Sequence, residues 1–385
     1  MVEVGQNMGD EAVMVSLETF ARKRIGKMIS SGELKVNIPL PSERKLAGLM
    51  GISRTPVSRA LGELEREGII NKISPKKYVP VQTASKSSGV LSQAVVFFNR
   101  SSREKWEHYA EFHKYERGVL SAVEQGAHDL FTVGDMDKVR NSAAWIINEK
   151  PFGVICSDSF SADRSLLGTF TKIRESGTNI VMSGDAEWLA DFDRVVPDQE
   201  TGAYEIAKWL HSHGRKNILR LHFHDHSKYW ISMRNRGYEK AAIEFGFNKL
   251  DEVFIPGISP TGRYDRKKRE NLARNAAGYL GEILFGRKTE VDALMCSSDE
   301  NCGIAAVALE MLGKKPGSDI WIAGFDNTWK LMGYRPDSKD KPVITADNCM
   351  EEIGPKALSI LAGRRNGAIS GGSVLEKVPV KIIVP

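Results

Sequence analysis

The sequence has no hydrophobic run long enough to cross a membrane, and its 385 residues include only four cysteines. A transmembrane helix needs about 20 consecutive apolar residues, so we expect no membrane partner. The acidic N-terminal segment also lacks the basic and apolar regions of a signal peptide. Metal-site spacing is absent among Cys156, Cys296, Cys302 and Cys349, which predicts reduced thiols and a cytoplasmic location.

Signatures of catalysis and cofactor binding are missing as well. The sequence contains no Walker-type glycine–lysine loop, no Rossmann glycine fingerprint after a strand and no nucleophile elbow. It also shows no repeat of solenoid length. These absences favour a protein that is not an enzyme and holds no cofactor.

The composition, with 41% hydrophobic and 27% charged residues, is that of an ordinary folded protein with two or three domains. The net charge of +5 is unevenly distributed, because residues 16–82 contain 13 basic and only 6 acidic residues. Binding to DNA is driven largely by basic side chains that release counterions from the phosphates. Residues 16–82 are therefore the candidate DNA-binding part of the chain.

Residues 40–61 have the pattern of a helix-turn-helix. The segment Ser42–Met50 predicts one helix, with Pro41 at its first position and an apolar stripe made by Leu46, Ala47 and Met50. Gly51 permits a sharp turn, and Ser53 is suited to cap the next helix. An amphipathic helix pair in some other small helical domain is the alternative.

The second helix of this pair has a polar start and an apolar inner face. Its inner face is predicted to consist of Val57, Leu61 and Leu64. Arg54, Thr55 and Ser58 are expected to be exposed, and such side chains suit phosphates and base edges in the major groove. Arg59 either contacts DNA or solvates the helix.

Residues 16–81 resemble the winged-helix domain of the GntR family. The resemblance lies in Leu-Pro-Ser-Glu-Arg at 40–44, the helix start at 53–58, Glu-Gly-Ile-Ile at 67–70 and a two-stranded wing at 71–81. It implies DNA contacts from Arg44, Ser53, Arg54, Thr55, Pro56 and Ser58. The usual glycine-rich wing tip is replaced by Ser74-Pro75-Lys76-Lys77, in which Lys76 and Lys77 are still expected to reach phosphates.

The rest of the chain alternates between predicted strands and helices. Residues 1–15 are expected to be a disordered tail, and residues 82–91 a polar linker. Strands are predicted at 90–98, 130–133, 152–156, 179–182, 217–222, 253–255, 293–296 and 320–323. The helices between them are predicted at 109–126, 139–148, 166–176, 202–213, 233–245, 271–285 and 300–312. This alternation predicts α/β architecture with parallel sheets covered on both faces.

Within residues 92–385, several segments resemble, in the right order, the effector-binding domain of LacI-type repressors, which shares its fold with periplasmic sugar-binding proteins. The segments are 195–203, 210–218, 234–238, 298–303, 319–327 and 343–348. The resemblance implies a two-lobed domain, used for effector binding and dimerisation, with crossings between lobes near residues 195, 325 and 346. It also implies an effector site in the cleft, at the carboxyl ends of the strands.

The same resemblance implies the effector-binding residues. Arg234 would bind a hydroxyl or carboxylate of the ligand, and Asp326 would accept from paired hydroxyls. Asn348 stands where the family often has glutamine, and Ser298 where it often has asparagine. Asp185, after the strand at 179–182, is a further candidate at the rim. The structural alternatives are an ion pair for Arg234 and a turn for Asp326.

His222, His224 and His226 alternate, so three imidazoles lie on one face of an extended segment. This pattern raises a metal site as a hypothesis. The sequence offers no second ligand group, and we expect a surface or rim cluster with no metal.

A GntR-type head joined to a LacI-type body is similar to regulators of the arabinose-repressor type. The resemblance implies a repressor that binds palindromic operator DNA as a homodimer and is released by a monosaccharide or similar polyol. The alternative is a solute-binding or sugar-modifying protein with an accessory DNA-binding head.

Overall fold

The computed structural model of the chain describes residues 16–30, 32–35, 38–66, 69–74, 77–80, 92–99, 110–223, 228–256, 266–329 and 341–385. The described residues form two compact units. Unit 1 takes its residues from 1–101, 119–194 and 354–374, and unit 2 takes its residues from 102–118, 195–353 and 375–385.

Besides the short excursion into unit 2 at residues 102–118, the chain changes unit between Arg194 and Val195, and again after residues 353 and 374. The crossing expected near residue 325 is not there, because residues 195–353 belong to unit 2 throughout. The strands on either side of that position, β12 (Trp321–Phe325) and β13 (Ile344–Asp347), are parallel neighbours in one sheet. The change expected near residue 346 falls at 353.

The described residues between 16 and 80 form a winged helix. Its elements are α1 (Leu17–Ser30), α2 (Glu43–Met50), α3 (Arg54–Arg66), β1 (Ile70–Ser74) and β2 (Lys77–Pro80). The two strands pair antiparallel. The apolar stripes predicted for the two central helices are confirmed, since their side chains are buried in a shared core. Pro41 precedes α2 instead of opening it, and Ser42 is the N-cap residue, with its Oγ accepting from the Lys45 N–H.

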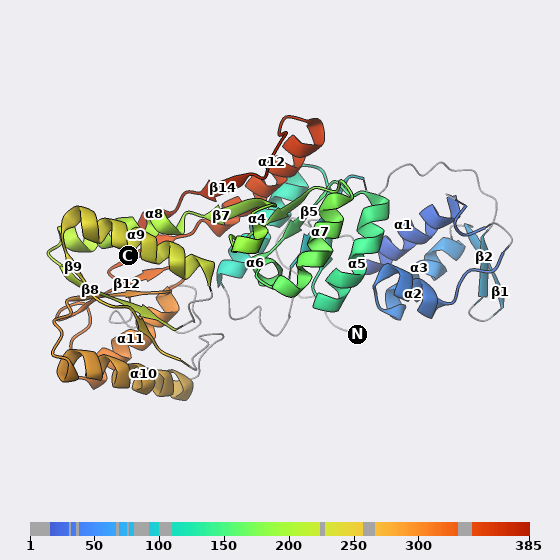
Figure 1. The fold of residues 1–385 in the computed structure, drawn as a ribbon. Coiled ribbons are helices and arrows are strands. Elements are labelled where there is room, and N and C mark those ends of the chain that lie inside the picture. Colours follow the sequence, from blue (N-terminus) through green and yellow to red (C-terminus); the bar gives the residue numbers. More distant parts are fainter. Residues whose placement is uncertain are drawn as a thin grey trace. The chain divides into compact units, whose positions relative to one another are not determined.

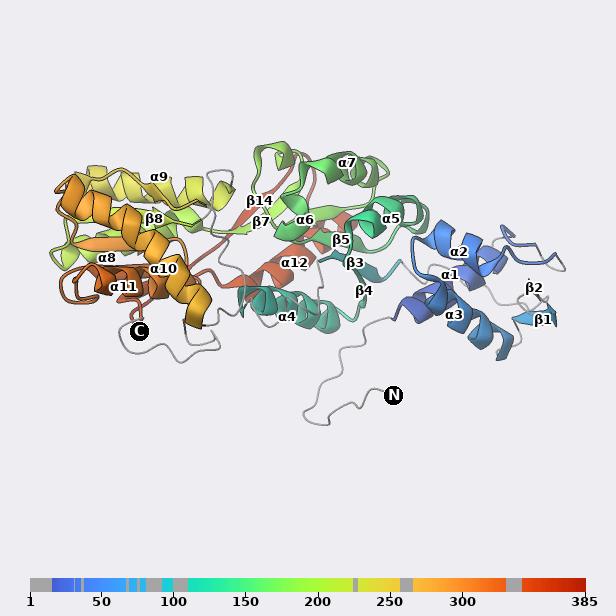
Figure 2. The ribbon, with the colours of Figure 1, turned by 90° about the horizontal axis from the view of Figure 1, so that it is seen from below.

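A six-stranded sheet with strand order β14–β7–β6–β5–β3–β4 follows the winged helix. Its strands are β3 (Ala94–Phe98), β4 (Asp129–Val133), β5 (Gly153–Cys156), β6 (Ile180–Met182), β7 (Asp193–Pro197) and β14 (Leu375–Val378). The five neighbouring strands β4, β3, β5, β6 and β7 run parallel. Figure 2 shows α5 (Met136–Glu149) and α7 (Leu167–Glu175) over one face, and α4 (Ala110–Gln125) and α12 (Ile353–Asn366) over the other. The short helical turns are α6 (Asp158–Ser161), η2 (Arg164–Leu166) and η3 (Glu187–Leu189).

Unit 2 is built on a sheet with strand order β10–β8–β11–β12–β13–β15, to which β9 adds beside β8. Besides β12 and β13, its strands are β8 (Asn217–His222), β9 (Asn248–Lys249), β10 (Val253–Phe254), β11 (Ala293–Cys296) and β15 (Lys381–Ile383). Figure 1 shows α8 (Gln199–Ser212) and α9 (Tyr229–Phe245) on one face of this sheet, and α10 (Arg266–Gly281) and α11 (Asp299–Met311) on the other. A π-helical turn, η4 (Glu282–Gly286), follows α10, and η6 (Met350–Glu352) precedes α12.

Alternation along the strands explains this layering. In β8, Ile218 packs into the core under α8 and α9, whereas Leu219 and Leu221 pack into the core under α10 and α11. Parallel strands covered on both faces were predicted from the sequence, and the structure confirms them. In the unit 2 sheet, β15 runs antiparallel to its neighbour, β13.

The helices α8 and α9 lie unusually close together at Gly237. A Cβ atom at this position would lie 2.0 Å from the Glu200 carbonyl oxygen and 2.9 Å from the Tyr204 nitrogen. Both of these atoms belong to the backbone of α8, so they cannot move away as the end of a side chain could. Glycine at 237 is therefore required by the packing of the two helices.

We predict that Gly237→Ala lowers the free energy of unfolding of unit 2 by about 3 kcal/mol, because the added methyl group forces α8 and α9 apart. Gly278→Ala is the matched control: it lies in α10 and has nothing within 4 Å of the added Cβ. The control is expected to raise stability by about 0.5–1 kcal/mol. Urea unfolding followed by circular dichroism measures both, and equal effects of the two substitutions would refute the packing argument.

Candidate functional site

The first candidate site is the exposed face of the helix-turn-helix. Gly51 ends α2 in the left-handed region, with φ 65°, and its N–H donates to carbonyls of the last turn of α2. Helix α3, the predicted recognition helix, then begins at Arg54, and its inner side chains Val57 and Leu61 are buried. This leaves the polar first turn of α3 facing outward.

The structure places the predicted DNA-contacting side chains together on this surface. All are exposed except Pro56, which is half-buried: Arg44, Ser53, Arg54, Thr55, Pro56, Ser58 and Arg59. Lys77 is exposed at the start of β2, whereas Lys76 lies outside the described residues. Arg59 is within 3.7 Å of the Glu18 carboxylate, so it has a structural partner as well as an exposed position.

Glu43, which the sequence interpretation did not single out, positions two of these side chains. Its Oε1 accepts a hydrogen bond from the Ser58 hydroxyl at 3.1 Å. Its Oε2 lies 4.0 Å from an Arg54 guanidinium nitrogen. Glu43 therefore links the first turn of α2 to the start of the recognition helix.

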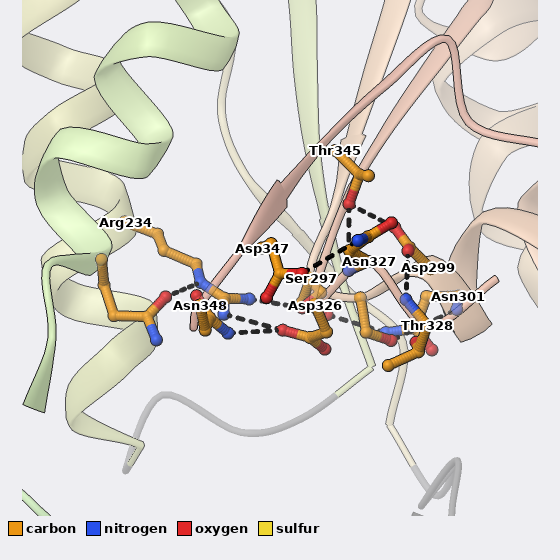
Figure 3. Close-up of polar contacts among 12 residues, drawn as sticks. Arg234, Ser297, Asp299, Asn301, Asp326, Asn327, Thr328, Thr345, Asp347 and Asn348 are labelled. Atoms are coloured by element: carbon orange, nitrogen blue, oxygen red, sulfur yellow. Dashed lines mark hydrogen bonds and ion pairs between the residues drawn. The ribbon is translucent and has the colours of Figure 1, made fainter. Parts of the chain in front are cut away.

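The second candidate site lies at the carboxyl edge of the unit 2 sheet and is centred on Arg234 of α9. The Arg234 side chain is buried and donates from Nε to Gln199 Oε1 at 2.7 Å, and from Nη1 to the Ser297 carbonyl. Its guanidinium also lies 3.8 Å from the centre of the Phe325 ring. These contacts fix the side chain and direct Nη2 toward Asp326, as Figure 3 shows.

Asp326 and Asn348 meet at this point. Asp326 Oδ1 accepts from Asn348 Nδ2 at 2.8 Å and from Arg234 Nη2 at 3.4 Å. Asp326 and Asn327 have φ angles of 90° and 48°, a left-handed backbone that residues other than glycine seldom adopt. Such strain is often found at ligand-binding positions. The structure thus brings together three residues that the sequence predicted as effector contacts.

Asp347 and Lys114 extend the cluster. The Lys114 ammonium donates to both carboxylate oxygens of Asp347, at 3.1 and 3.0 Å. Asn327 Nδ2 and the Cys349 N–H donate to the same carboxylate. Burial works against the charged form, but these hydrogen bonds hold the pKa of Asp347 below its usual range.

Asp299 hydrogen-bonds to the backbone of the loop after β12 and to a side chain of β13. Its Oδ2 accepts from the N–H groups of Thr328 and Trp329, at 2.8 and 3.3 Å, and its Oδ1 accepts from the Thr345 hydroxyl at 2.7 Å. Burial raises the pKa of Asp299 to about 7, and the nearby Asp326 charge acts in the same direction. Figure 3 shows Asp299 between the loop after β12 and strand β13.

Two predicted effector contacts are engaged elsewhere. Ser298 is the N-cap of α11, and its Oγ accepts from the Asn301 N–H at 3.3 Å. Asp185 belongs to unit 1 and forms an ion pair with Arg194. Gln199, Lys114 and Asp347 join the unit 2 cluster instead, and the sequence interpretation did not name them as contacts.

His222 is buried at the end of β8, where its ring stacks on Phe254. Its Nε2 lies 3.3 Å from Glu252 Oε2, and this contact, together with a hydrogen bond from Asn235, lowers the pKa of Glu252 to about 2. Burial lowers the pKa of His222 itself. His224 and His226 lie outside the described residues, and no metal-binding group of side chains occurs among those described.

Within the described parts of the chain, no helix combines the length and the apolar character that a membrane span requires.

Comparison with known proteins matches residues 17–74 to the family described as "Bacterial regulatory proteins, gntR family". Over 353 residues, the chain is 26% identical to the HTH-type transcriptional regulator DegA of Bacillus subtilis (strain 168), with 88% of this chain and 94% of that protein covered. A shorter match to the HTH-type transcriptional repressor NagR of the same organism is 41% identical over 51 residues, which cover 13% of this chain and 21% of NagR.

Solved structures share the fold at low identity. The "transcriptional regulator CelR-cellobiose complex" has a TM-score of 0.58 and 14% identity, and the match covers 90% of this chain and 99% of that one. A regulatory protein of the LacI family from Chloroflexus aggregans has a TM-score of 0.59 and 15% identity, over 76% of this chain and 98% of that one. Residues 17–74 thus match the gntR family of bacterial regulatory proteins, the chain as a whole is similar to a transcriptional regulator, and most of it shares its fold with a regulatory protein of the LacI family.

The raised pKa of Asp299 predicts a pH-dependent stability of unit 2. In the folded chain the Asp299 carboxyl keeps its proton up to about pH 7, whereas an ordinary aspartate loses its proton near pH 3.8. The protonated Asp299 therefore stabilises the folded state fully below about pH 4, and this stabilisation is lost as pH rises through 7. We expect unit 2 to be about 2–4 kcal/mol less stable at pH 8 than at pH 4 on this account. Asp299→Asn should remove that part of the pH dependence, as measured by urea unfolding at several pH values. Asp251→Asn, at an exposed position, is the control, and an unchanged slope in Asp299→Asn would contradict the assignment.

Proposed function

We propose that this regulator is a repressor that binds palindromic operator DNA as a homodimer and releases it when a monosaccharide or similar neutral polyol binds to unit 2. The observation that carries the proposal is the Arg234–Asp326–Asn348 cluster at the carboxyl edge of the unit 2 sheet, in a chain that also has an exposed recognition helix. We place the protein in the cytoplasm, where it meets DNA.

The chemistry of the recognition surface supports the DNA part of the proposal. Arg54, Thr55 and Ser58 lie at the N-terminal end of α3, where exposed donors suit base edges and phosphates in the major groove. Lys77 on the wing and Arg44 on α2 supply positive charge for the backbone. Glu43 reduces the conformational freedom of Arg54 and Ser58 before DNA is bound.

The balance of charges in unit 2 supports an uncharged ligand. Two cations, Arg234 and Lys114, face two carboxylates, Asp326 and Asp347. An anionic ligand would leave an excess of negative charge in a half-buried site, which is costly. A polyol gains hydrogen bonds from both kinds of group without adding charge.

The contact between Arg234 Nη2 and Asp326 Oδ1 is long, at 3.4 Å. A hydrogen bond of this length is weak, so a ligand hydroxyl replaces it at little cost. Paired hydroxyls of a sugar fit a carboxylate and a guanidinium side by side. Three structural neighbours are complexes with cellobiose, ribose and D-xylulofuranose, which agrees with this ligand class.

The direct test uses the DNA upstream of the protein's own gene in a gel mobility shift, with and without a panel of pentoses, hexoses and uronates. The proposal expects a specific complex that one neutral sugar dissociates. A solute-binding or sugar-modifying protein with an accessory head would bind or convert a sugar without any change in DNA binding. Failure to bind the DNA under every condition would end the regulator proposal.

Two substitutions separate specific from general DNA contacts. Arg54→Ala is expected to weaken binding to the specific DNA by about 1–3 kcal/mol and to reduce discrimination against unrelated DNA. Lys77→Ala should weaken binding to all sequences and lower the slope of log affinity against log salt by about one. Fluorescence anisotropy at several salt concentrations measures both. Indistinguishable behaviour of the two variants would argue against the assigned roles.

A further inference from the structure

One surface of unit 1 is not explained by effector or DNA binding: a single face of α5 that carries Asn141, Trp145 and Glu149. These residues are spaced by four, so their side chains lie above one another along the helix. Trp145 and Glu149 are buried, with exposed fractions of 3% and 4%. A glutamate at the end of a covering helix is buried only if another element packs on it.

The packing element is α1 of the winged helix. Phe20 of α1 is fully buried, and its ring lies 4.9 Å from Trp145 and 4.4 Å from Phe131 of strand β4. Phe131 and Trp145 meet edge to face, so the three rings form one cluster. The cluster joins the core of the winged helix to the core of unit 1.

Glu149 adds a buried charge contact beside the rings. It is the last residue of α5, where the helix dipole disfavours a carboxylate. Its two oxygens accept hydrogen bonds from Arg24 and from Lys27, the latter at 2.7 Å, and both cations belong to α1. A buried carboxylate in this unfavourable position is stable only when cations pair with it, and both of these cations come from α1.

The turn of the helix-turn-helix touches the other end of the same face. A Cβ atom at Gly51 would lie 3.2 Å from Asn141 Cβ. Gly51 immediately precedes the segment that leads into α3, so the contact bears on the position of the recognition helix. Lys23 of α1 and Asp129 of β4 add an ion pair at 3.1 Å at the edge of the interface.

We propose that this face of α5 is a permanent seat for the DNA-binding domain, occupied by α1 of the same chain, so that the recognition helix and unit 1 move as one rigid body. The packing of α1 on this face does not depend on the proposed function. One consequence rests on that function: a movement of unit 1 on effector binding carries the recognition helix with it.

A zero-length carbodiimide cross-link tests the seat in the full-length chain without DNA. Lys23 and Asp129 are reachable by the reagent, since their side chains are 23% and 34% exposed. We expect a Lys23–Asp129 amide, identified by peptide mass spectrometry, in the wild-type chain. A mixture of isotopically labelled and unlabelled protein should give links within one chain only. Mixed links would place the head of a second copy on the seat, and absence of the link would refute the seat altogether.

Glu149→Arg provides the second arm of the test, because it changes neither cross-linked residue. The variant is expected to lower the yield of the Lys23–Asp129 link about tenfold by placing a third cation beside Arg24 and Lys27. Adding Arg24→Glu should restore most of the yield. Glu124→Arg makes the same charge change on the exposed surface of α4 and should leave the yield unchanged.

An unchanged yield in Glu149→Arg would overturn the proposal. Circular dichroism of each variant confirms that the fold is retained, and the Arg24→Glu rescue separates a lost contact from a damaged fold. Because the readout needs neither operator DNA nor sugar, its failure is distinguishable from failure of the proposed function. On the upstream DNA, Glu149→Arg should in addition weaken binding, whereas Glu124→Arg should not.

Discussion

The buried carboxylate of Asp299 is the constraint on which the unit 2 site depends. It accepts hydrogen bonds from the start of the loop after β12 and from Thr345 of β13, and thereby fixes two neighbouring strand ends relative to α11. This anchoring lets Asp326 and Asn327 keep their left-handed backbone, which would otherwise relax. Gly324 belongs to the same arrangement, since a Cβ atom there would lie 2.2 Å from Asp299 Oδ1. Gly324 in the Gly324-Phe325-Asp326 motif is therefore set by packing, next to a residue that we propose as an effector contact.

Much of the architecture follows from local sequence patterns. The strands at 217–222 and 293–296 were predicted with their observed bounds, because each is a short, largely apolar segment with clear polar ends. The strands β9, β14 and β15 and helix α12 were not predicted. Several of their side chains are exposed, so the sequence lacks the apolar periodicity that marks a covered element. The prediction of a crossing between lobes near residue 325 was wrong. Whether the chain leaves a lobe there depends on which sheet the next strand joins, and that is decided by pairing with segments distant in the sequence.

The site shows the same division. Arg234, Asp326 and Asn348 were found through their motifs, and they meet in the structure. Lys114 was not found, because it lies outside the resembling segments and its partner Asp347 lies far along the chain. Ser298 was assigned to the ligand, but its hydroxyl caps α11, which its position before an acidic helix start also allows. Motifs thus point to residues of a candidate site, and the contacts among them come from the fold.

The proposed DNA-binding surface lies in unit 1 and the proposed polyol site in unit 2, and thermodynamic linkage tests their coupling most directly. The measurement is the dissociation constant of the active sugar, by isothermal titration, with and without saturating upstream DNA. Reciprocity requires that DNA weaken sugar binding by the same factor by which the sugar weakens DNA binding. We predict a common factor of about tenfold or more. Equal sugar affinities in the presence and absence of DNA would contradict the account.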